Sequence, residues 1–361
     1  MKYPLFEYFL LFIQGERMNV LAYIRRRLFF LILVLFGLSI ITFTLTKIVP
    51  VDPTVIWSGD RASKEVIQKI RIDFGLDKSV PMQYYLYVSN LLKGNMGKSF
   101  TTKHFVIDDV KQFFPATLEL VIFAWLFALF IGIPVGIYSA VKSNTQIDHI
   151  GRFFSLSGVS LPLFWLGLLL QILFFKKLGW FPLQGRIGTT TAIFHPLQSI
   201  TGLYILDSLF TCNWIALKDA LWHISLPAIT LAFSAIALVT RMTRSCMLEI
   251  LSKEYITMEK AYGLPDRKIY FVYALKNALV PIITIVALAI GNNFLGAILV
   301  ETVFDWPGLG RYAVRSILAA DFAPVMGVTL IIGTIYVFLN LLVDILYALI
   351  DPRITLFKKT K

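Results

Sequence analysis

The 361-residue chain is poor in charged residues and in the side chains that build metal centres. Only 16% of its residues are Asp, Glu, Lys or Arg, against about 25% in typical soluble domains, which argues against an ordinary soluble fold. It has two cysteines, Cys212 and Cys246, and four scattered histidines. No histidine stands at i, i+4 from another histidine or beside a cysteine, so we expect no metal site and no cofactor.

A complete phosphate-binding loop is also lacking. The stretch GNMGKSF at 94–100 has the Gly-Lys-Ser end of that motif, but Leu92 stands where its first glycine is required. The sequence shows no nucleophile–base pair either. We therefore predict no catalytic residues and no enzymatic activity for this chain.

Long uncharged runs are what the chain has in abundance. Residues 28–46 form one such run of 19 residues, about 28 Å long as a helix and roughly one bilayer core. The pattern predicts an all-α, polytopic membrane protein. Its six transmembrane helices are expected at 28–47, 116–141, 152–175, 222–240, 279–300 and 325–349.

The distribution of Lys and Arg predicts the orientation. The net charge of +12 would favour nucleic acid in a soluble protein, but in a membrane protein basic residues concentrate in cytoplasmic loops, and we expect no nucleic acid. Both termini and the loop 241–278 are then cytoplasmic, in the cell membrane, which separates the two cysteines and predicts no disulfide. The expected division is a cytoplasmic segment 1–27, a six-span domain 28–349 with external loops 48–115 and 176–221, and a tail 350–361.

Residues 1–17 are an apolar segment too short to span the membrane. MNVLAYIRRRL, beginning at Met18, resembles a complete N-terminus, so one hypothesis is that translation starts at Met18 and not at Met1.

The external loop 48–115 carries two helical patterns. Ser63 and Glu65 begin the first, and Gly75 is placed to end it. The second runs from about Val80 to Leu92 and is rich in tyrosine, which suits a membrane interface. We leave open whether they pack on the bundle, contact a partner protein, or do both.

Between the fourth and fifth spans the chain turns polar, with EYITMEKAYGLPDRK at 254–268. Ser252 is the expected cap of a helix from Lys253 to about Tyr262. Gly263 then ends the helix and Pro265 suits the first turn of the next one. The helix packs either under its own bundle or into another protein.

The apolar face of this helix is formed by three residues at i, i+3 and i+7. They are Tyr255, Met258 and Tyr262.

This stretch resembles DYIxTARAKGL, the pattern of the same loop in inner-membrane permeases of ABC importers of the dipeptide, oligopeptide and nickel class. TRMTRSCMLEIL, ETVFDWPGLG and NLLVDILYALIDPRI resemble further motifs of the class, and the resemblance covers nearly all of 18–357. Of the wider ABC-permease motif only Gly263 and Leu275 are kept. Val51 replaces a glycine of the class motif Pro-Gly-Asp-Pro.

The resemblance implies a type I ABC importer permease fold, in which the short cytoplasmic helix couples the spans to an ATPase subunit. The implied partners are a second homologous permease subunit, two ABC ATPase subunits, an extracytoplasmic substrate-binding protein and membrane lipid. Di- and oligopeptides are the expected cargo, with nickel or oligosaccharides as alternatives. The residues expected to contact the ATPase are Glu254, Tyr255, Met258, Glu259, Ala261, Tyr262, Gly263, Leu264 and Arg267.

Polar residues inside the spans carry functional hypotheses by default. We predict that Asp344 pairs with Arg241 or Arg244 and tethers the coupling loop to the bundle, unless it merely reaches the interface. The residues expected to line the pathway or shape the outer gate are Asn292, Asn293, Glu301 and Trp306.

A stand-alone secondary carrier is the competing function. It is disfavoured because the intramembrane charges are too few for an ion relay and because the cytoplasmic insert would have no purpose.

Overall fold

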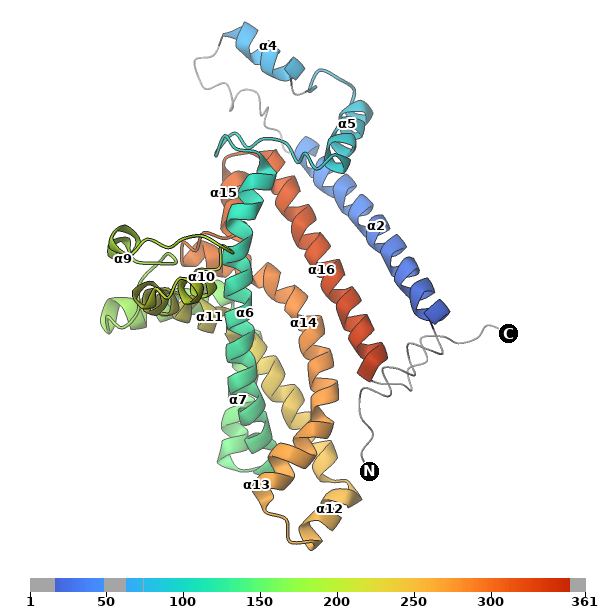
Figure 1. The fold of residues 1–361 in the computed structure, drawn as a ribbon, viewed down its shortest axis with the longest axis vertical. Coiled ribbons are helices and arrows are strands. Elements are labelled where there is room, and N and C mark those ends of the chain that lie inside the picture. Colours follow the sequence, from blue (N-terminus) through green and yellow to red (C-terminus); the bar gives the residue numbers. More distant parts are fainter. Residues whose placement is uncertain (1–16, 49–62, 74, 351–361) are drawn as a thin grey trace.

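The computed structural model describes residues 17–48, 63–73 and 75–350 (Figure 1). These residues form helices and turns, with one isolated β-bridge between Lys98 and Phe105. The predicted extension at 1–17, apart from its last residue, and the tail after Ile350 lie outside the described residues. So do Val51 and its neighbours.

Long apolar helices dominate the fold, as the uncharged runs predicted. Five of those described are long and apolar enough to cross a membrane, or six spans if one bent pair counts as a single span. The five single-helix spans are formed by α2 (Arg17–Ile48), α6 (Val106–Val141), α11 (Trp214–Leu251), α14 (Leu275–Val303) and α16 (Phe322–Ile350). The span through α14 begins earlier, with α13 (Asp266–Lys268) and η2 (Ile269–Ala274).

The third predicted span, 152–175, is not one helix. It is divided into α7 (Gln146–Ser160) and α8 (Leu163–Leu170), with η1 (Gln171–Lys177) continuing α8, and the two parts meet at 111°. Pro162 causes the break because it has no N–H to donate and forces Leu161 out of the helical region, to φ −86° and ψ 128°. The prediction of a single helix overlooked this proline.

Helices α6 and α11 form the central pair of the bundle. Gly132 and Gly136 of α6 face Val239 and Thr243 of α11, and a Cβ at Gly136 would lie 2.6 Å from the Thr243 Cβ. Small residues therefore let the two backbones approach closely, as is common between transmembrane helices. Alanines of both helices fill the adjoining buried core.

The other spans pack around this pair. Helix α14 lies against α6, α11 and α16, and α16 lies against α2. Gly291 of α14 faces the ring of Tyr336 on α16, and Gly333 of α16 faces Leu38 on α2. Small residues again mark the closest approaches.

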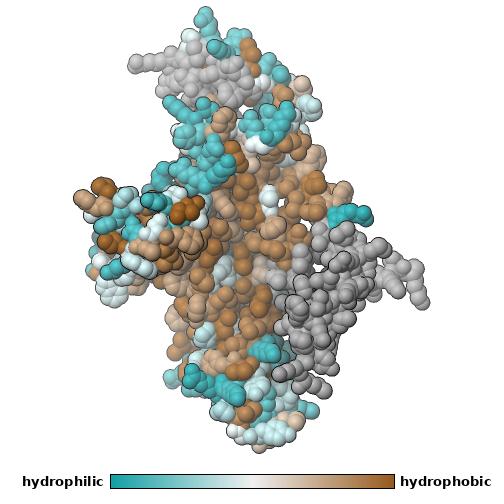
Figure 2. Space-filling model, in the orientation of Figure 1, coloured by the Kyte–Doolittle hydropathy of each residue, from teal (hydrophilic) through white to brown (hydrophobic). Residues whose placement is uncertain are grey.

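The ends of the bundle are polar and its middle is apolar. Figure 2 shows hydrophobic side chains along the middle and hydrophilic ones at both ends. One end carries α12 (Glu254–Ala261) and α13, and the opposite end carries α15 (Leu309–Leu318) with α4 (Lys64–Asp73) and α5 (Val80–Leu92) (Figure 1). We call these the α12 end and the α15 end. Two short helices, α9 (Thr189–Phe194) and α10 (Tyr204–Phe210), project sideways between them.

The two helices predicted in the 48–115 loop are confirmed. Gly75 follows the first with φ +63°, as its predicted stop requires. Helix α5 packs on α2, where Tyr84 lies 2.9 Å from the Ser39 hydroxyl and 5.3 Å from the Phe43 ring. Leu92 of α5 is 84% exposed, so the helix packs on the bundle and still presents an apolar surface.

Candidate functional site

Helix α12 begins without the cap that the sequence predicted. Ser252 ends α11, where its hydroxyl donates to the Glu249 carbonyl at 2.7 Å. The N-cap of α12 is Lys253, which has extended backbone and makes no side-chain cap bond. The sequence predicted that the fourth span ends at residue 240, whereas α11 continues through Leu251 and Ser252 is its C-cap.

The C-terminus of α12 has the glycine stop that the sequence predicted. Gly263 has φ +73°, its N–H donates to the Lys260 carbonyl at 3.0 Å, and the Leu264 N–H donates to the Glu259 carbonyl at 3.3 Å. These two bonds form a Schellman motif, which requires the left-handed conformation that glycine adopts without strain. Pro265 is the N-cap of α13, one position before the predicted first turn.

One residue of α12 packs inward and three apolar residues stay exposed. Ile256 is 1% exposed and packs in the cluster formed by Met247, Ile269 and their neighbours under the helix. By contrast Tyr255, Met258 and Tyr262 are 38%, 57% and 78% exposed. We call these three the coupling face; it is the apolar surface that the sequence predicted for contact with a partner.

The other residues expected at this surface surround the coupling face. Glu254, Ala261 and Arg267 are exposed, while Glu259 and Leu264 are half-buried. One carboxyl oxygen of Glu259 is buried without a hydrogen-bond partner among the described residues. Tyr255 is held from one side, because its hydroxyl accepts from the Asn277 amide of α14 at 3.0 Å.

A buried ion pair that the sequence did not predict lies near the α12 end of α11. Asp148 of α7 is fully buried, and its carboxylate accepts from Arg244 Nε at 2.6 Å and Nη2 at 2.8 Å. It also accepts from the Ser139 hydroxyl of α6 at 2.6 Å and the Asn144 N–H at 2.9 Å. Arg152 approaches it to 3.4 Å. We call these residues the Asp148 cluster.

The predicted tether of Asp344 to an arginine is not tested, because the Asp344 side chain lies outside those that the structure describes. Arg244 is already held by Asp148 in a bidentate pair, and Arg241 is exposed one turn earlier. The signal for Asp148 was its place in a basic internal loop, four residues before Arg152. No sequence pattern connected it to Arg244, 96 positions away.

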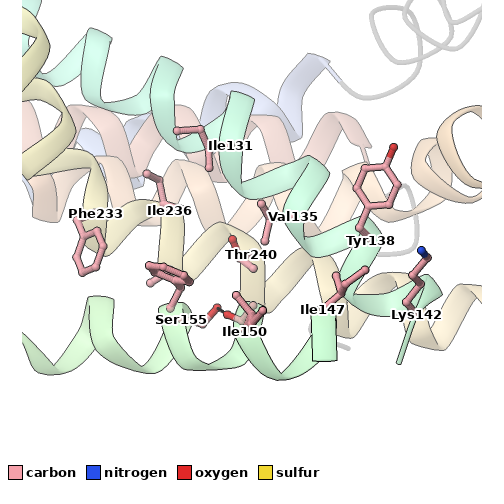
Figure 3. Close-up of a pocket in the computed structure, with 13 residues that line it drawn as sticks. Ile131, Val135, Tyr138, Lys142, Ile147, Ile150, Ser155, Phe233, Ile236 and Thr240 are labelled. Atoms are coloured by element: carbon pink, nitrogen blue, oxygen red, sulfur yellow. Dashed lines mark hydrogen bonds between the residues drawn. The ribbon is translucent and has the colours of Figure 1, made fainter. Parts of the chain in front are cut away.

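An apolar cavity of about 680 Å³ lies between α6, α7 and α11. Figure 3 shows Val135 of α6 and Ile236 and Thr240 of α11 on one side, with Ile150 and Ser155 of α7 on the other. The middle turns of α7 therefore form one wall of this cavity, while Gly151 in the same stretch is buried close to α6.

Glu301 and Trp306, expected at an outer gate, are both buried. The carboxyl oxygens of Glu301 accept from the Thr117 hydroxyl at 2.6 Å and from the N–H groups of Gly310 and Arg311 at 2.7 and 3.0 Å. Trp306 Nε1 donates to the Ala116 carbonyl of α6 at 2.8 Å. These residues fix the 304–310 turn against α6 and expose almost no surface of their own; their role at a gate stays a prediction.

The two asparagines expected in the pathway occupy different environments on α14. Asn292 is exposed and Asn293 is half-buried. The Asn293 amide nitrogen has no acceptor among the described residues.

Two buried carboxylates at the base of the α9–α10 projection were also missed by the sequence. Glu119 of α6 pairs with Arg186, whose guanidinium lies 3.7 Å from the centre of the Tyr204 ring. Asp207 accepts from the N–H and hydroxyl of Thr201, at 2.8 and 2.6 Å. Burial alone would raise the pKa of Asp207, but its hydrogen bonds outweigh burial and hold the pKa below its ordinary value.

Comparison with known proteins gives a consistent result along the chain. Residues 132–356 match the family described as binding-protein-dependent transport system inner membrane component. Residues 20–121 match the N-terminal region of such membrane components.

Three curated relatives are similar over almost their full length. A probable D,D-dipeptide transport system permease protein of Escherichia coli K12, DdpB, is 45% identical over 93% of this chain and 98% of its own. A dipeptide transport system permease protein of Alkalihalophilus pseudofirmus, DppB, is 40% identical over 93% of this chain and 99% of its own. The DppB of E. coli K12 is 36% identical with the same coverage.

Proposed function

The chain belongs to the family of binding-protein-dependent transport system inner membrane components, and from this premise we propose that it forms half of an ATP-driven import pathway. It is a multi-pass membrane protein and the permease subunit of a transport system, and its relatives are permeases and not enzymes. In the proposed assembly two ATPase subunits hydrolyse ATP, and a second homologous permease completes the pathway.

The coupling face is the observation that carries the proposal. Tyr255, Met258 and Tyr262 lie at the tip of the bundle, on a helix fixed from behind by buried Ile256 and stopped sharply at Gly263. Aromatic residues and methionine are typical of interface cores. A rigid helix with such a face suits docking into a cleft of an ATPase subunit.

The proposed orientation places the α12 end in the cytoplasm. The loop 241–278 at that end carries seven Lys and Arg residues, as the positive-inside rule expects. Both termini are then cytoplasmic, 28–349 is the permease domain, and the α15 end with α4 and α5 faces the substrate-binding protein.

The proposed cargo is a di- or oligopeptide. The names of the relatives, among them a di/tripeptide permease of Pseudomonas aeruginosa that is 39% identical, support this class. The binding protein delivers the peptide to the α15 end. Closure of the ATPase pair then moves α12, and the two permease subunits open the pathway to alternate sides.

Uptake of a labelled dipeptide tests the function. The chain, its partner permease, the ATPases and the binding protein are reconstituted in proteoliposomes with ATP inside. We expect uptake that requires both ATP and the binding protein. Uptake by this chain alone would indicate a secondary carrier and contradict the proposal.

Charge placed on the coupling face tests the proposed site. Met258→Glu and Tyr262→Glu should each lower ATP-dependent uptake at least tenfold, because a carboxylate would be desolvated in the ATPase cleft. The matched controls Met258→Leu and Tyr262→Phe keep the apolar contact and should retain most of the uptake. Normal uptake in both glutamate variants would exclude this surface from coupling.

A further inference from the structure

Helix α7 is attached to its neighbours towards both ends and borders an apolar cavity along its middle turns. At one end the Asp148 cluster joins it to α6 and α11. At the other, Gly158 lies so close to α11 that a Cβ there would overlap Ala237. Between these contacts lies the cavity of about 680 Å³, seen in Figure 3 between the middle of α7 and the helices α6 and α11.

The Asp148 cluster is a stiff attachment. Its carboxylate accepts four hydrogen bonds at 2.6 to 2.9 Å, two of them from one planar guanidinium, and bidentate charge-assisted pairs fix geometry strongly. Gly151 places α7 against α6, since a Cβ there would lie 3.2 Å from the Ser139 hydroxyl oxygen. Because separation of the pair would leave Asp148 buried without its main partner, the cluster resists being pulled apart.

The part of α11 that forms the ion pair with α7 also contributes to the apolar cluster that contains a residue of α12. Three residues after Arg244, Met247 is fully buried in the apolar cluster that contains Ile256 of α12. Helix α12 therefore packs on η2 and shares a buried apolar cluster with the end of α11, and α11 is joined to α7 through Arg244. A displacement of α12 therefore has a continuous route to α7, through this apolar cluster with η2, then α11 and one ion pair.

We propose that Asp148 and Arg244 are positioning residues that make α7 follow the coupling helix. When α12 moves, the pair carries the α12 end of α7 along, while the Gly158 contact stays in place and the cavity accommodates the change in tilt. The 111° bend at Pro162 passes this tilt on to α8. The inference rests on the proposed function, because it requires that α12 is driven by an ATPase.

The test separates coupling from assembly. Asp148→Asn is reconstituted with the complete transporter, and four quantities are measured: assembled complex, basal ATP hydrolysis, its stimulation by peptide-loaded binding protein, and peptide uptake. We expect assembly and basal hydrolysis within about twofold of wild type, with stimulation and uptake reduced at least tenfold. A purely structural role would lower all four together. The matched control is Glu249→Gln, which removes a carboxylate of α11 from an exposed pair with Lys253, the N-cap of α12, and should change none of them.

Two further variants keep the test decisive. The double variant Asp148→Arg with Arg244→Asp exchanges the two charges. Its uptake should be at least fivefold higher than that of Asp148→Asn. If Asp148→Asn does not assemble, Arg244→Lys decides, because lysine keeps the charge but loses the bidentate fork. Reduced stimulation in an assembled Arg244→Lys complex supports the proposal, and wild-type stimulation overturns it. A wild-type complex without ATP-coupled uptake would instead contradict the proposed function itself.

Discussion

The carboxyl group of Glu301 is predicted to hold the turn between α14 and α15 closed. It accepts three hydrogen bonds, from Thr117, Gly310 and Arg311, in a site from which solvent is excluded. A hydrogen bond to a charged group contributes about 1.5–3 kcal/mol, and at the lower end of this range the three bonds lost in Glu301→Ala amount to about 5 kcal/mol. Loss of the cost of burying the carboxylate offsets part of this, and we take about 3 kcal/mol as the net effect.

Limited trypsin digestion measures this effect locally. The trypsin sites in the segment are Arg311 and Arg315, and cleavage requires the turn and α15 to open. When cleavage follows the population of the open form, about 3 kcal/mol corresponds to a roughly 150-fold faster cleavage. The control Thr302→Val, next to Glu301, removes a hydroxyl that bonds only within its own helix and should leave cleavage within about threefold.

Gly308 gives an independent check on the same carboxyl group. Its backbone has φ −108°, which any residue adopts, but a Cβ would overlap the Glu301 carboxyl group. Gly308→Ala alone should therefore lower the free energy needed to open the turn by about 2 kcal/mol. In the Glu301→Ala background it should cost almost nothing, because the overlapping atoms are gone. Additive effects of the two substitutions would refute this placement of Glu301.

Three further predictions concern single positions. Gly263→Ala should cost about 1 kcal/mol, because alanine is strained at φ +73°, and the thermal midpoint in detergent should fall accordingly. Gly136→Ala should lower that midpoint more, because its Cβ would lie 2.6 Å from Thr243 Cβ, whereas Gly37→Ala, with nothing within 4 Å, should be neutral. For Asp207, whose pKa is lowered by folding, the stabilisation is complete above the unfolded pKa of about 3.9 and is lost as pH falls through the lower folded value. Between pH 7 and pH 3 the loop at 200–207 should therefore lose stability in the wild type but not in Asp207→Asn, as hydrogen exchange would measure.

Local patterns in the sequence predicted the local structure well. The bounds of α5 and the left-handed Gly263 follow from the spacing of apolar residues and from glycine's freedom at positive φ. The errors had local causes too. Pro162 interrupts a segment whose composition predicts one span, and Ser252 ends α11 because that helix continues through Leu251, beyond its expected end at residue 240.

The sequence did not allow the buried ion pairs near the candidate site to be predicted. Asp148 and Arg244 are 96 positions apart, and Glu119 and Arg186 are 67 apart. Which of several acidic residues meets which arginine depends on how α6, α7 and α11 pack, and this packing is set by glycines whose partners lie on another helix. The helices themselves follow from the amino-acid sequence, whereas the buried ion pairs follow only from their packing.

The most direct test of the account is a photo-crosslink from the coupling face. A benzophenone is attached to Tyr262→Cys, with Cys212 and Cys246 replaced by serine, in a complex that imports peptide. We predict adducts with the ATPase subunit from position 262 and none from the control Leu92→Cys, which is 84% exposed on α5 at the other end of the bundle. A transporting complex that yields no ATPase adduct from position 262, or equal adducts from both positions, would contradict the assignment of α12 as the coupling helix.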